Sequence, residues 1–252
     1  EVLHDAGAAC WRGGWQPVEL RRLVARRGRP AHAHLVTDLV AAHLRPLPPG
    51  AVDPRWLAQA ADLGADVWWA DSDRYLDAFG ARWRLDRVTV LDTVLTLIGV
   101  LVRLPPVEVL LPPPGTTPKA GAGPGDDGTG RGRPGDGRLL DRVRALLAKA
   151  ESTTFPAEAE AYTAKAQELV ARHSIDEALL AARGDSVAVV PFARRIGVDQ
   201  PYEGEQAALL QAVARANRCH AVWSPELGFA TVFGFDADID AVDLLHTSLL
   251  VQ

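Results

Sequence analysis

Arginines gather near the start of the sequence at a spacing that suits phosphate binding. Five of them occupy nine positions: Arg21, Arg22, Arg26, Arg27 and Arg29. A helix would place Arg22, Arg26 and Arg29 on one face, because residues three and four apart are neighbours on a helix surface. Such a face could hold the phosphates of DNA or RNA. We favour a solvated face that meets acidic groups elsewhere, since residues 1–111 hold 13 basic and 13 acidic side chains.

A group of side chains with metal-ligand chemistry follows directly. His32, His34 and Asp38, with His43 further on, carry nitrogen and oxygen atoms of the kind that bind metals. Their spacing fits no well-known zinc motif, and the sequence has neither an HExxH helix nor paired CxxC turns. We therefore expect no metal site.

The remaining histidines and the second cysteine have structural explanations. Cys219 and His220 are adjacent, and adjacent strand residues point to opposite faces, which argues against a thiol–imidazole pair. His173 and His246 lie on otherwise apolar helical faces, where a hydrogen-bonded core or interface histidine is expected.

Carboxylates cluster near the C-terminal end of the sequence, at Asp236, Asp238, Asp240 and Asp243. They lack the glycine and the terminal glutamate of a calcium loop, so we expect them to cap and solvate the last helix. No nucleophile elbow, kinase motif or dinucleotide fingerprint occurs. The sequence thus predicts no catalytic residue and no cofactor, and the chain is more consistent with a non-enzyme.

Six of the seven tryptophans fall within residues 1–111: Trp11, Trp15, Trp56, Trp68, Trp69 and Trp83. The favoured interpretation is a small all-α bundle with a tryptophan-rich core. The alternative is that Trp11 and Trp15, in the segment CWRGGWQP, form an exposed binding surface. Two consecutive glycines favour a loop there, and loops often carry function.

Helical periodicity and start signals predict five helices in an N-terminal domain over residues 1–104. Their expected ranges are 17–27, 31–44, 54–65, 72–79 and 85–104. Residues 88–104 form the most apolar run, but Asp92 and Arg103 leave fewer than the roughly 18 uncharged residues of a membrane span. We expect a buried core helix and no membrane association. Two cysteines far apart in the sequence favour reduced thiols and a cytoplasmic location.

Residues 105–137 are rich in proline and glycine, which together make up 17 of the 33 positions. This composition cannot bury enough apolar surface to offset chain entropy, so we expect a disordered linker. Its glycines follow no strand and precede no Gly-Lys-Ser/Thr, which excludes a phosphate-binding loop.

Residues 138–184 predict a helical hairpin. Its first helix has an apolar stripe at helical spacing: Leu139, Val143, Leu146 and Ala150. The segment STTFP (152–156) ends this helix and starts the next. Tyr162, Leu169 and His173 lie on one face of the second helix, which we expect to contact a protein partner or the module that follows. Residues 174–176 then break the pattern before a short third helix over 177–183, ended by glycine.

The hairpin closely resembles the family called domain of unknown function 2786, which is common in actinobacterial and phage proteins. The resemblance rests on the run LLAKAESTTFP followed by AEA, AKAQEL and ARHSID, across about forty residues. It implies a small helical unit beside other domains and carries over no catalytic residue. The region from Tyr202 onward resembles the segment that often follows this hairpin.

Residues 187–252 predict a small β-α-β-β-α module. The expected elements are a strand over 187–196, a helix over 202–217, strands over 220–223 and 229–235, and a last helix from Asp236 or Asp238. This order makes a small antiparallel sheet backed by helices. The chain starts with Glu1, lacks methionine and stops within a helical pattern, so we expect a fragment with a truncated module.

These expectations combine into an α+β, mainly α protein. Residues 138–252 hold 11 basic and 16 acidic side chains, which disfavours generic nucleic-acid binding. The leading hypothesis is a non-catalytic cytosolic interaction or adaptor protein with a protein partner. The first alternative is a nucleic-acid-associated protein that uses the basic helix over 21–29. The second is an enzyme completed by residues beyond 252.

Overall fold

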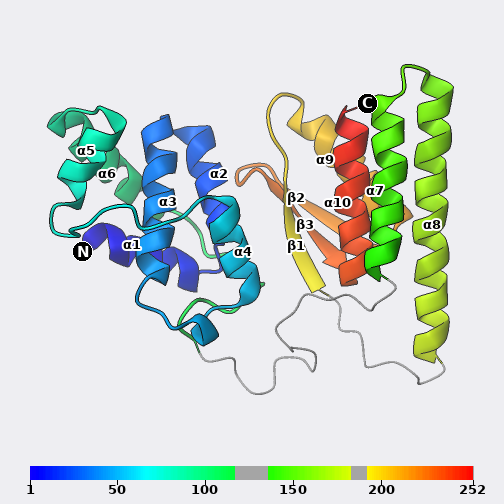
Figure 1. Cartoon of the computed structure of the whole chain (residues 1–252), viewed down its shortest axis with the longest axis horizontal. Helices are drawn as coiled ribbons and strands as arrows, with labels where there is room; N and C mark the ends of the chain where they lie inside the picture. The colour runs from blue at the N-terminus through cyan, green and yellow to red at the C-terminus, as the bar shows by residue number, and fades with distance from the viewer. Residues whose placement is uncertain (117–135, 183–191, 252) are drawn as a thin grey trace. The chain divides into compact units, whose positions relative to one another are not determined.

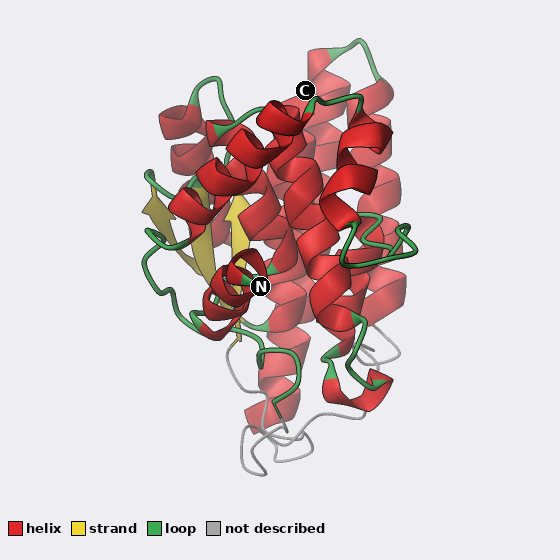
Figure 2. Ribbon diagram, turned by 90° about the vertical axis from the view of Figure 1, so that its left-hand side faces the viewer, coloured by secondary structure: helices red, strands yellow, loops and turns green. Residues whose placement is uncertain are grey.

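The computed structural model describes residues 1–116, 136–182 and 192–251. The chain divides into two compact units, Glu1–Ala122 and Gly123–Gln252 (Figure 1). Ten α-helices and a three-stranded antiparallel sheet occur in the described residues (Figure 2). The α+β, mainly α prediction is therefore confirmed. Among the described helices, none combines the length and the apolar character that a bilayer crossing requires.

In its described residues the first unit has six α-helices and one 3-10 turn. They are α1 (Val2–Arg12), α2 (Pro17–Arg27), α3 (Pro30–Leu44), η1 (Pro49–Ala51), α4 (Pro54–Asp62), α5 (Tyr75–Trp83) and α6 (Arg87–Leu101). Prolines occupy the first helical position of α2, α3 and α4, where their missing N–H costs nothing. The five predicted helices are present, but α5 begins and ends three to four residues later than the expected 72–79.

The first helix, α1, was not predicted from the pattern. Glu1 makes no side-chain cap hydrogen bond, and Gly7 lowers the intrinsic helix propensity of the segment. Tertiary packing stabilises the helix instead, because Cys10 and Trp11 are buried against the other helices. Gly7 permits this packing: a Cβ at that position would lie 2.6 Å from Cδ2 of Leu39 in α3.

The segment that follows α6 packs onto the first unit. The Trp15 indole donates a hydrogen bond to the Pro105 carbonyl (2.9 Å), and the Val107 amide donates to the Gly13 carbonyl (2.8 Å). Leu111 is buried. Residues 105–116 therefore belong to this unit and not to the predicted linker, whose remaining residues 117–135 lie outside the described residues.

The second unit contains the predicted hairpin and the predicted β-α-β-β-α module. Its elements are α7 (Asp136–Ser152), α8 (Pro156–Ala182), β1 (Phe192–Gly197), α9 (Glu203–Ala216), β2 (His220–Ser224), β3 (Phe229–Gly234) and α10 (Asp236–Val251). The strands lie in the order β1-β3-β2, with both pairs antiparallel. Figure 1 shows α7 between α10 and α8.

One core joins the hairpin to the sheet. Val143 and Leu147 of α7 and Ala166 and Val170 of α8 belong to the same buried cluster as side chains of the strands, α9 and α10. The hairpin's apolar face is thus covered by the module that follows it. The sequence left two possibilities for this face, a protein partner or the module that follows, and the structure shows the module.

Two boundaries of the second unit differ from the sequence predictions. Helix α8 runs without a break through residues 174–176 to Ala182, so no separate third helix forms. The predicted strand over 187–196 corresponds to β1 at Phe192–Gly197, and residues 187–191 lie outside the described residues. A triplet such as Ser-Ile-Asp lowers helix propensity by only a fraction of a kcal/mol per residue, which a long helix tolerates.

Candidate interaction surface

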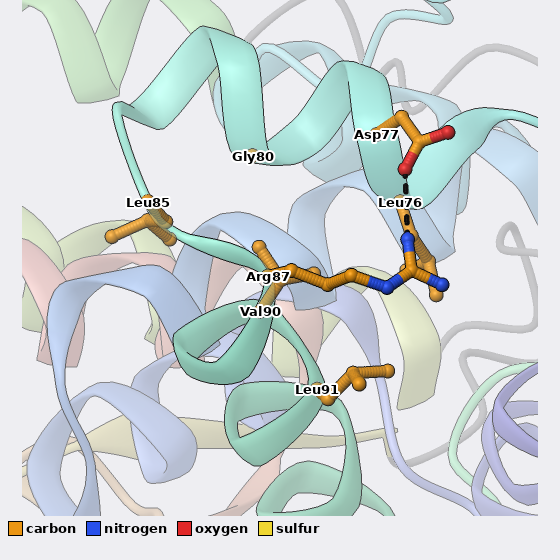
Figure 3. A pocket seen from close by; sticks show the side chains of 7 residues that line it. All are labelled: Leu76, Asp77, Gly80, Leu85, Arg87, Val90 and Leu91. Carbon is orange, nitrogen blue, oxygen red and sulfur yellow. Dashed lines mark hydrogen bonds and ion pairs between the residues drawn. The ribbon is translucent and has the colours of Figure 1, made fainter.

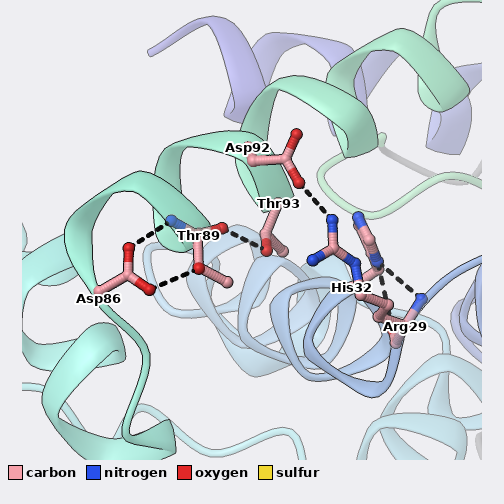
Figure 4. A network of polar contacts seen from close by, with 6 residues as sticks. All are labelled: Arg29, His32, Asp86, Thr89, Asp92 and Thr93. Atoms are coloured by element: carbon pink, nitrogen blue, oxygen red, sulfur yellow. Dashed lines mark hydrogen bonds and ion pairs between the residues drawn. The ribbon is translucent and has the colours of Figure 1, made fainter.

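Helix α6 is held in place by a network at its N-terminus (Figure 4). Asp86 caps the helix by accepting hydrogen bonds from the Thr89 amide (2.9 Å) and the Thr89 hydroxyl (2.7 Å). These two bonds hold the pKa of the Asp86 carboxyl below its usual range. The buried Thr93 hydroxyl donates to the Thr89 carbonyl at 2.7 Å.

A second contact ties α6 to the start of α3. The Arg29 guanidinium donates to the Asp92 carboxylate in an ion pair (Figure 4). The Arg29 backbone amide in turn donates to His32 Nδ1 at 3.0 Å, which fixes the first turn of α3. The orientation of α6 about its axis is therefore set by specific polar contacts as well as by packing.

The inner face of α6 fills the core of the first unit. Val90, Thr93, Leu97 and Leu101 are buried, and the helix contacts α1, α3 and α5. These positions follow helical spacing and cover only part of the helix circumference. The sequence of α6 is nevertheless apolar over a much wider arc, because valine, leucine and isoleucine also occupy positions outside this face.

The excess apolar residues form an exposed stripe along α6, which we call the α6 stripe: Val88, Leu91, Leu95, Ile98 and Val102, the last at the C-cap. Val88 is 77% exposed, Leu95 68%, Val102 66% and Leu91 41%, and Ile98 is half-buried. Their helical spacing aligns them on one face of α6, opposite the buried face. Contiguous exposed apolar surface rimmed by polar groups marks interaction sites. The prediction of a buried core helix is therefore confirmed for the inner face of α6 and wrong for its outer face.

A pocket of about 170 Å³ opens beside the N-terminal half of the stripe (Figure 3). Its walls come from α5 and α6 and the short connection between them: Leu76, Asp77, Gly80, Leu85, Arg87, Val90 and Leu91. Leu91 belongs both to this pocket and to the α6 stripe. Arg87 and Asp77 form an ion pair at 3.1 Å across the pocket, so the charged groups at its edge neutralise each other.

The predicted arginine face is not assembled as expected. Arg22 and Arg26 lie on α2 and are half-buried, whereas Arg29 lies beyond the helix end, as the N-cap of α3. Gly28 interrupts the helix in an extended conformation, which rotates Arg29 away from the i,i+3 position that a continuous helix would give it. Arg29 also pairs with Asp92, so it does not continue the α2 helix face on which the sequence placed it with Arg22 and Arg26.

Trp11 and Trp15 do not form an exposed binding surface. Each is 1% exposed, and the Trp11 ring packs edge-on against Trp56 with centroids 5.4 Å apart. Gly13 and Gly14 do make a turn here, as predicted. The segment that follows α6 packs closely against this turn, because a Cβ on Gly14 would lie 2.4 Å from the Val107 carbonyl oxygen. The tryptophan-rich core is the interpretation that the structure supports.

Two of the hairpin residues proposed for partner binding, Leu169 and Tyr162, have intramolecular contacts. Leu169 is half-buried and packs against the core of the second unit. The ammonium group of Lys149 in α7 lies 5.8 Å from the centroid of the half-buried Tyr162 ring. The side chain of His173 lies outside the described residues.

Asp38 has protein partners that satisfy its carboxylate. The Trp68 indole donates to Oδ1 at 2.8 Å and the Tyr75 hydroxyl donates to Oδ2 at 2.7 Å. Burial raises the pKa of Asp38, and these two hydrogen bonds oppose the shift. The His34 ring stacks on Trp83 with centroids 3.6 Å apart. In the part of the chain that the structure describes, no group of three or more His, Cys, Asp or Glu side chains is arranged to hold a metal ion.

Three of the four aspartates that the sequence predicted to cap and solvate the last helix, α10, form ion pairs. Arg194 of β1 contacts Asp240 at 2.5 Å and Asp236 at 3.0 Å, and Arg218 contacts Asp238 at 3.7 Å. The nearby carboxylates raise the pKa of Arg194 against the effect of its burial. Asp236 and Asp240 thus tie α10 to the edge strand β1, a contact that the sequence order alone did not indicate.

Residues 138–177 match the family described as Protein of unknown function (DUF2786). The match covers α7 and most of α8, and an α+β region follows it, in agreement with the resemblance seen in the sequence. Comparisons with curated proteins and with solved structures return no match. The matched segment lies in the second unit, so it assigns no role to the α6 stripe of the first.

Proposed function

We propose that this protein is an interaction protein whose docking surface is the α6 stripe. The observation that carries the proposal is the alignment of Val88, Leu91, Leu95 and Val102 on one exposed helix face. Burying apolar area is worth roughly 25 cal/mol per Å², so leaving such a row in water has a cost that a partner would remove. Helix α6 exposes this row although Asp86 caps it and the Arg29–Asp92 ion pair holds it against the start of α3.

The chemistry of the surface supports an apolar helical partner. A row with alternating three- and four-residue spacing lies along one side of a helix and suits side-by-side packing with a second helix. Two charged residues on α6 beside the stripe, Arg87 and Asp92, already have intramolecular ion-pair partners. The two cysteines are buried thiols, which is consistent with action in the cytoplasm, where thiols stay reduced.

The proposal is tested by photo-crosslinking in cells that express the full chain. A photoreactive amino acid is placed at position 95 in the stripe or, as a control, at the exposed position Asp62 of α4. We expect discrete protein adducts from position 95 that are absent from position 62. Equal labelling from both positions, or no adduct from position 95, would refute the interaction surface.

A further inference from the structure

We propose that the occupant of the α6 stripe is the same stripe of a second copy of this chain, packed antiparallel. This inference rests on the proposed function, because it names the partner of that surface. It requires that the stripe be complementary to itself under a two-fold rotation, which is the condition for a symmetric dimer interface.

The α6 stripe is nearly symmetric about Leu95. Val88 and Val102 lie seven residues before and after it, and Leu91 and Ile98 lie four before and three after. The two valines thus lie at the same distance from Leu95 in opposite directions, and the leucine and isoleucine, which are equal in size, lie at distances that differ by one residue. When two such helices run antiparallel, Leu95 of each copy lies near the two-fold axis and Val88 of one approaches Val102 of the other.

The helix ends also complement each other in this arrangement. The pocket between α5 and α6 lies beside Leu91, near the N-terminal half of the stripe. An antiparallel second copy brings its C-terminal end, with the 66% exposed Val102, to Val88 and so beside this pocket. The two-fold axis repeats the contact at the other end, so both pockets are used in the same way.

The polar groups beside the stripe do not oppose self-association. Asp92 is neutralised by Arg29, and Arg87 by Asp77 at 3.1 Å. A partner that carries the same pairs therefore brings no uncompensated charge from these four side chains, and the exposed Arg103 lies at the end of the stripe, next to Val102. Space beside Gly99 is open, since a Cβ there would meet no atom within 4 Å, and this allows a neighbouring backbone to approach closely.

The size of the surface predicts a weak dimer. A 15-residue helix is roughly 22 Å long, and one helical stripe offers less than the roughly 800 Å² per partner of a standard stable interface. We therefore expect a dissociation constant on the order of 1–100 μM.

Cysteine cross-linking of the full chain tests both the contact and its direction. The native Cys10 and Cys219 are buried, and burial raises the pKa of each thiol to about 11, so they remain unreactive. The variants are Leu95→Cys, Val88→Cys, Val102→Cys and the off-stripe control Asp62→Cys, oxidised with copper–phenanthroline. All four positions are exposed, so the substitutions leave the core intact.

The antiparallel pair predicts a distinct pattern of disulfide-linked dimers. Leu95→Cys alone forms dimers, and a mixture of Val88→Cys and Val102→Cys forms mixed dimers, whereas Val88→Cys alone does not exceed the Asp62→Cys control. Dimers of Val88→Cys alone would overturn the antiparallel arrangement. If Leu95→Cys forms no more dimers than the Asp62→Cys control, self-association is overturned. If photo-crosslinking from position 95 in cells then still gives adducts with another protein, the α6 stripe remains an interaction surface, and its occupant is that protein.

Discussion

His43 is a titratable group whose burial links folding to pH. Its ring lies 5.6 Å from His4 and 6.2 Å from Trp11, centroid to centroid. Burial, with the nearby charges of His4 and Arg12, lowers the pKa of His43 to about 4. An unfolded histidine titrates near 6.5, so between about pH 6.5 and 4 the unfolded chain binds more protons at this site than the folded chain. The stability contributed by neutral His43 is complete above pH 6.5 and is lost as the pH falls through this window.

Denaturant unfolding at pH 7 and pH 5 measures this effect through tryptophan fluorescence, since six of the seven tryptophans lie in the first unit. We expect lower stability at pH 5, with uptake of about one proton on unfolding assigned to His43. In His43→Gln the difference between the two pH values should shrink. An unchanged difference would assign the linkage to other groups, such as His34, whose pKa is also lowered by burial.

For single residues, the sequence predicted which side chains are buried better than it predicted which side chains they contact. The tryptophan-rich core followed from composition, because large aromatic side chains are buried wherever a core can hold them. The partners of Asp38 did not, since Trp68 and Tyr75 reach it from positions 30 and 37 residues further along the chain. Arg29 was misplaced for a local reason: an extended Gly28 separates it from α2.

Helix α6 depends on its N-cap for the position of the stripe. In Asp86→Ala the Thr89 amide and hydroxyl lose their acceptor, so we expect the melting temperature of the first unit to fall by a few degrees. Asp86→Asn keeps a good capping group and should recover most of the loss. Circular dichroism melting curves check both variants, and equal melting of the alanine variant and the wild type would contradict the capping role.

The hairpin is expected to be a structural part of the second unit. Leu147 is buried in the core shared by α7, α8, the sheet and α10. Its replacement by alanine should cost about 2–5 kcal/mol, whereas the exposed Arg144→Ala should change stability by less than about 0.5 kcal/mol. Hydrogen exchange of the β2 and β3 amides is the measurement. Faster exchange confined to the hairpin, with the strands unchanged, would show that the two parts fold independently.

The sequence predicted the helices that have strong start signals and missed the helix whose formation depends on tertiary packing. Prolines occupy the first position of α2, α3 and α4, and Asp53 caps α4. No such signal marks α1, which forms because its buried face fits α3 and α6. The α6 stripe had a sequence signal, an apolar arc wider than one buried face, but the sequence could not tell which part of the arc the rest of the unit would cover.

At the scale of the whole molecule, the family match and the proposed surface lie in different units. Residues 138–177 carry the match, whereas the α6 stripe lies in Glu1–Ala122. The boundary of the first unit was not predictable from composition, because the proline-rich residues 105–116 resemble a linker yet make backbone hydrogen bonds to Gly13 and Ala51. A protein of this organisation would dimerise through one unit and present two copies of the other.

Sedimentation velocity over a range of concentrations measures whether the chain dimerises through the α6 stripe. The wild-type chain, Leu95→Lys in the stripe and Thr96→Lys beside it are compared, since both positions are exposed and both variants add the same charge. We expect the wild type and Thr96→Lys to shift from monomer to dimer between roughly 1 and 100 μM, and Leu95→Lys to remain monomeric with unchanged thermal stability. Identical sedimentation of the wild type and Leu95→Lys at every concentration would contradict dimerisation through the α6 stripe.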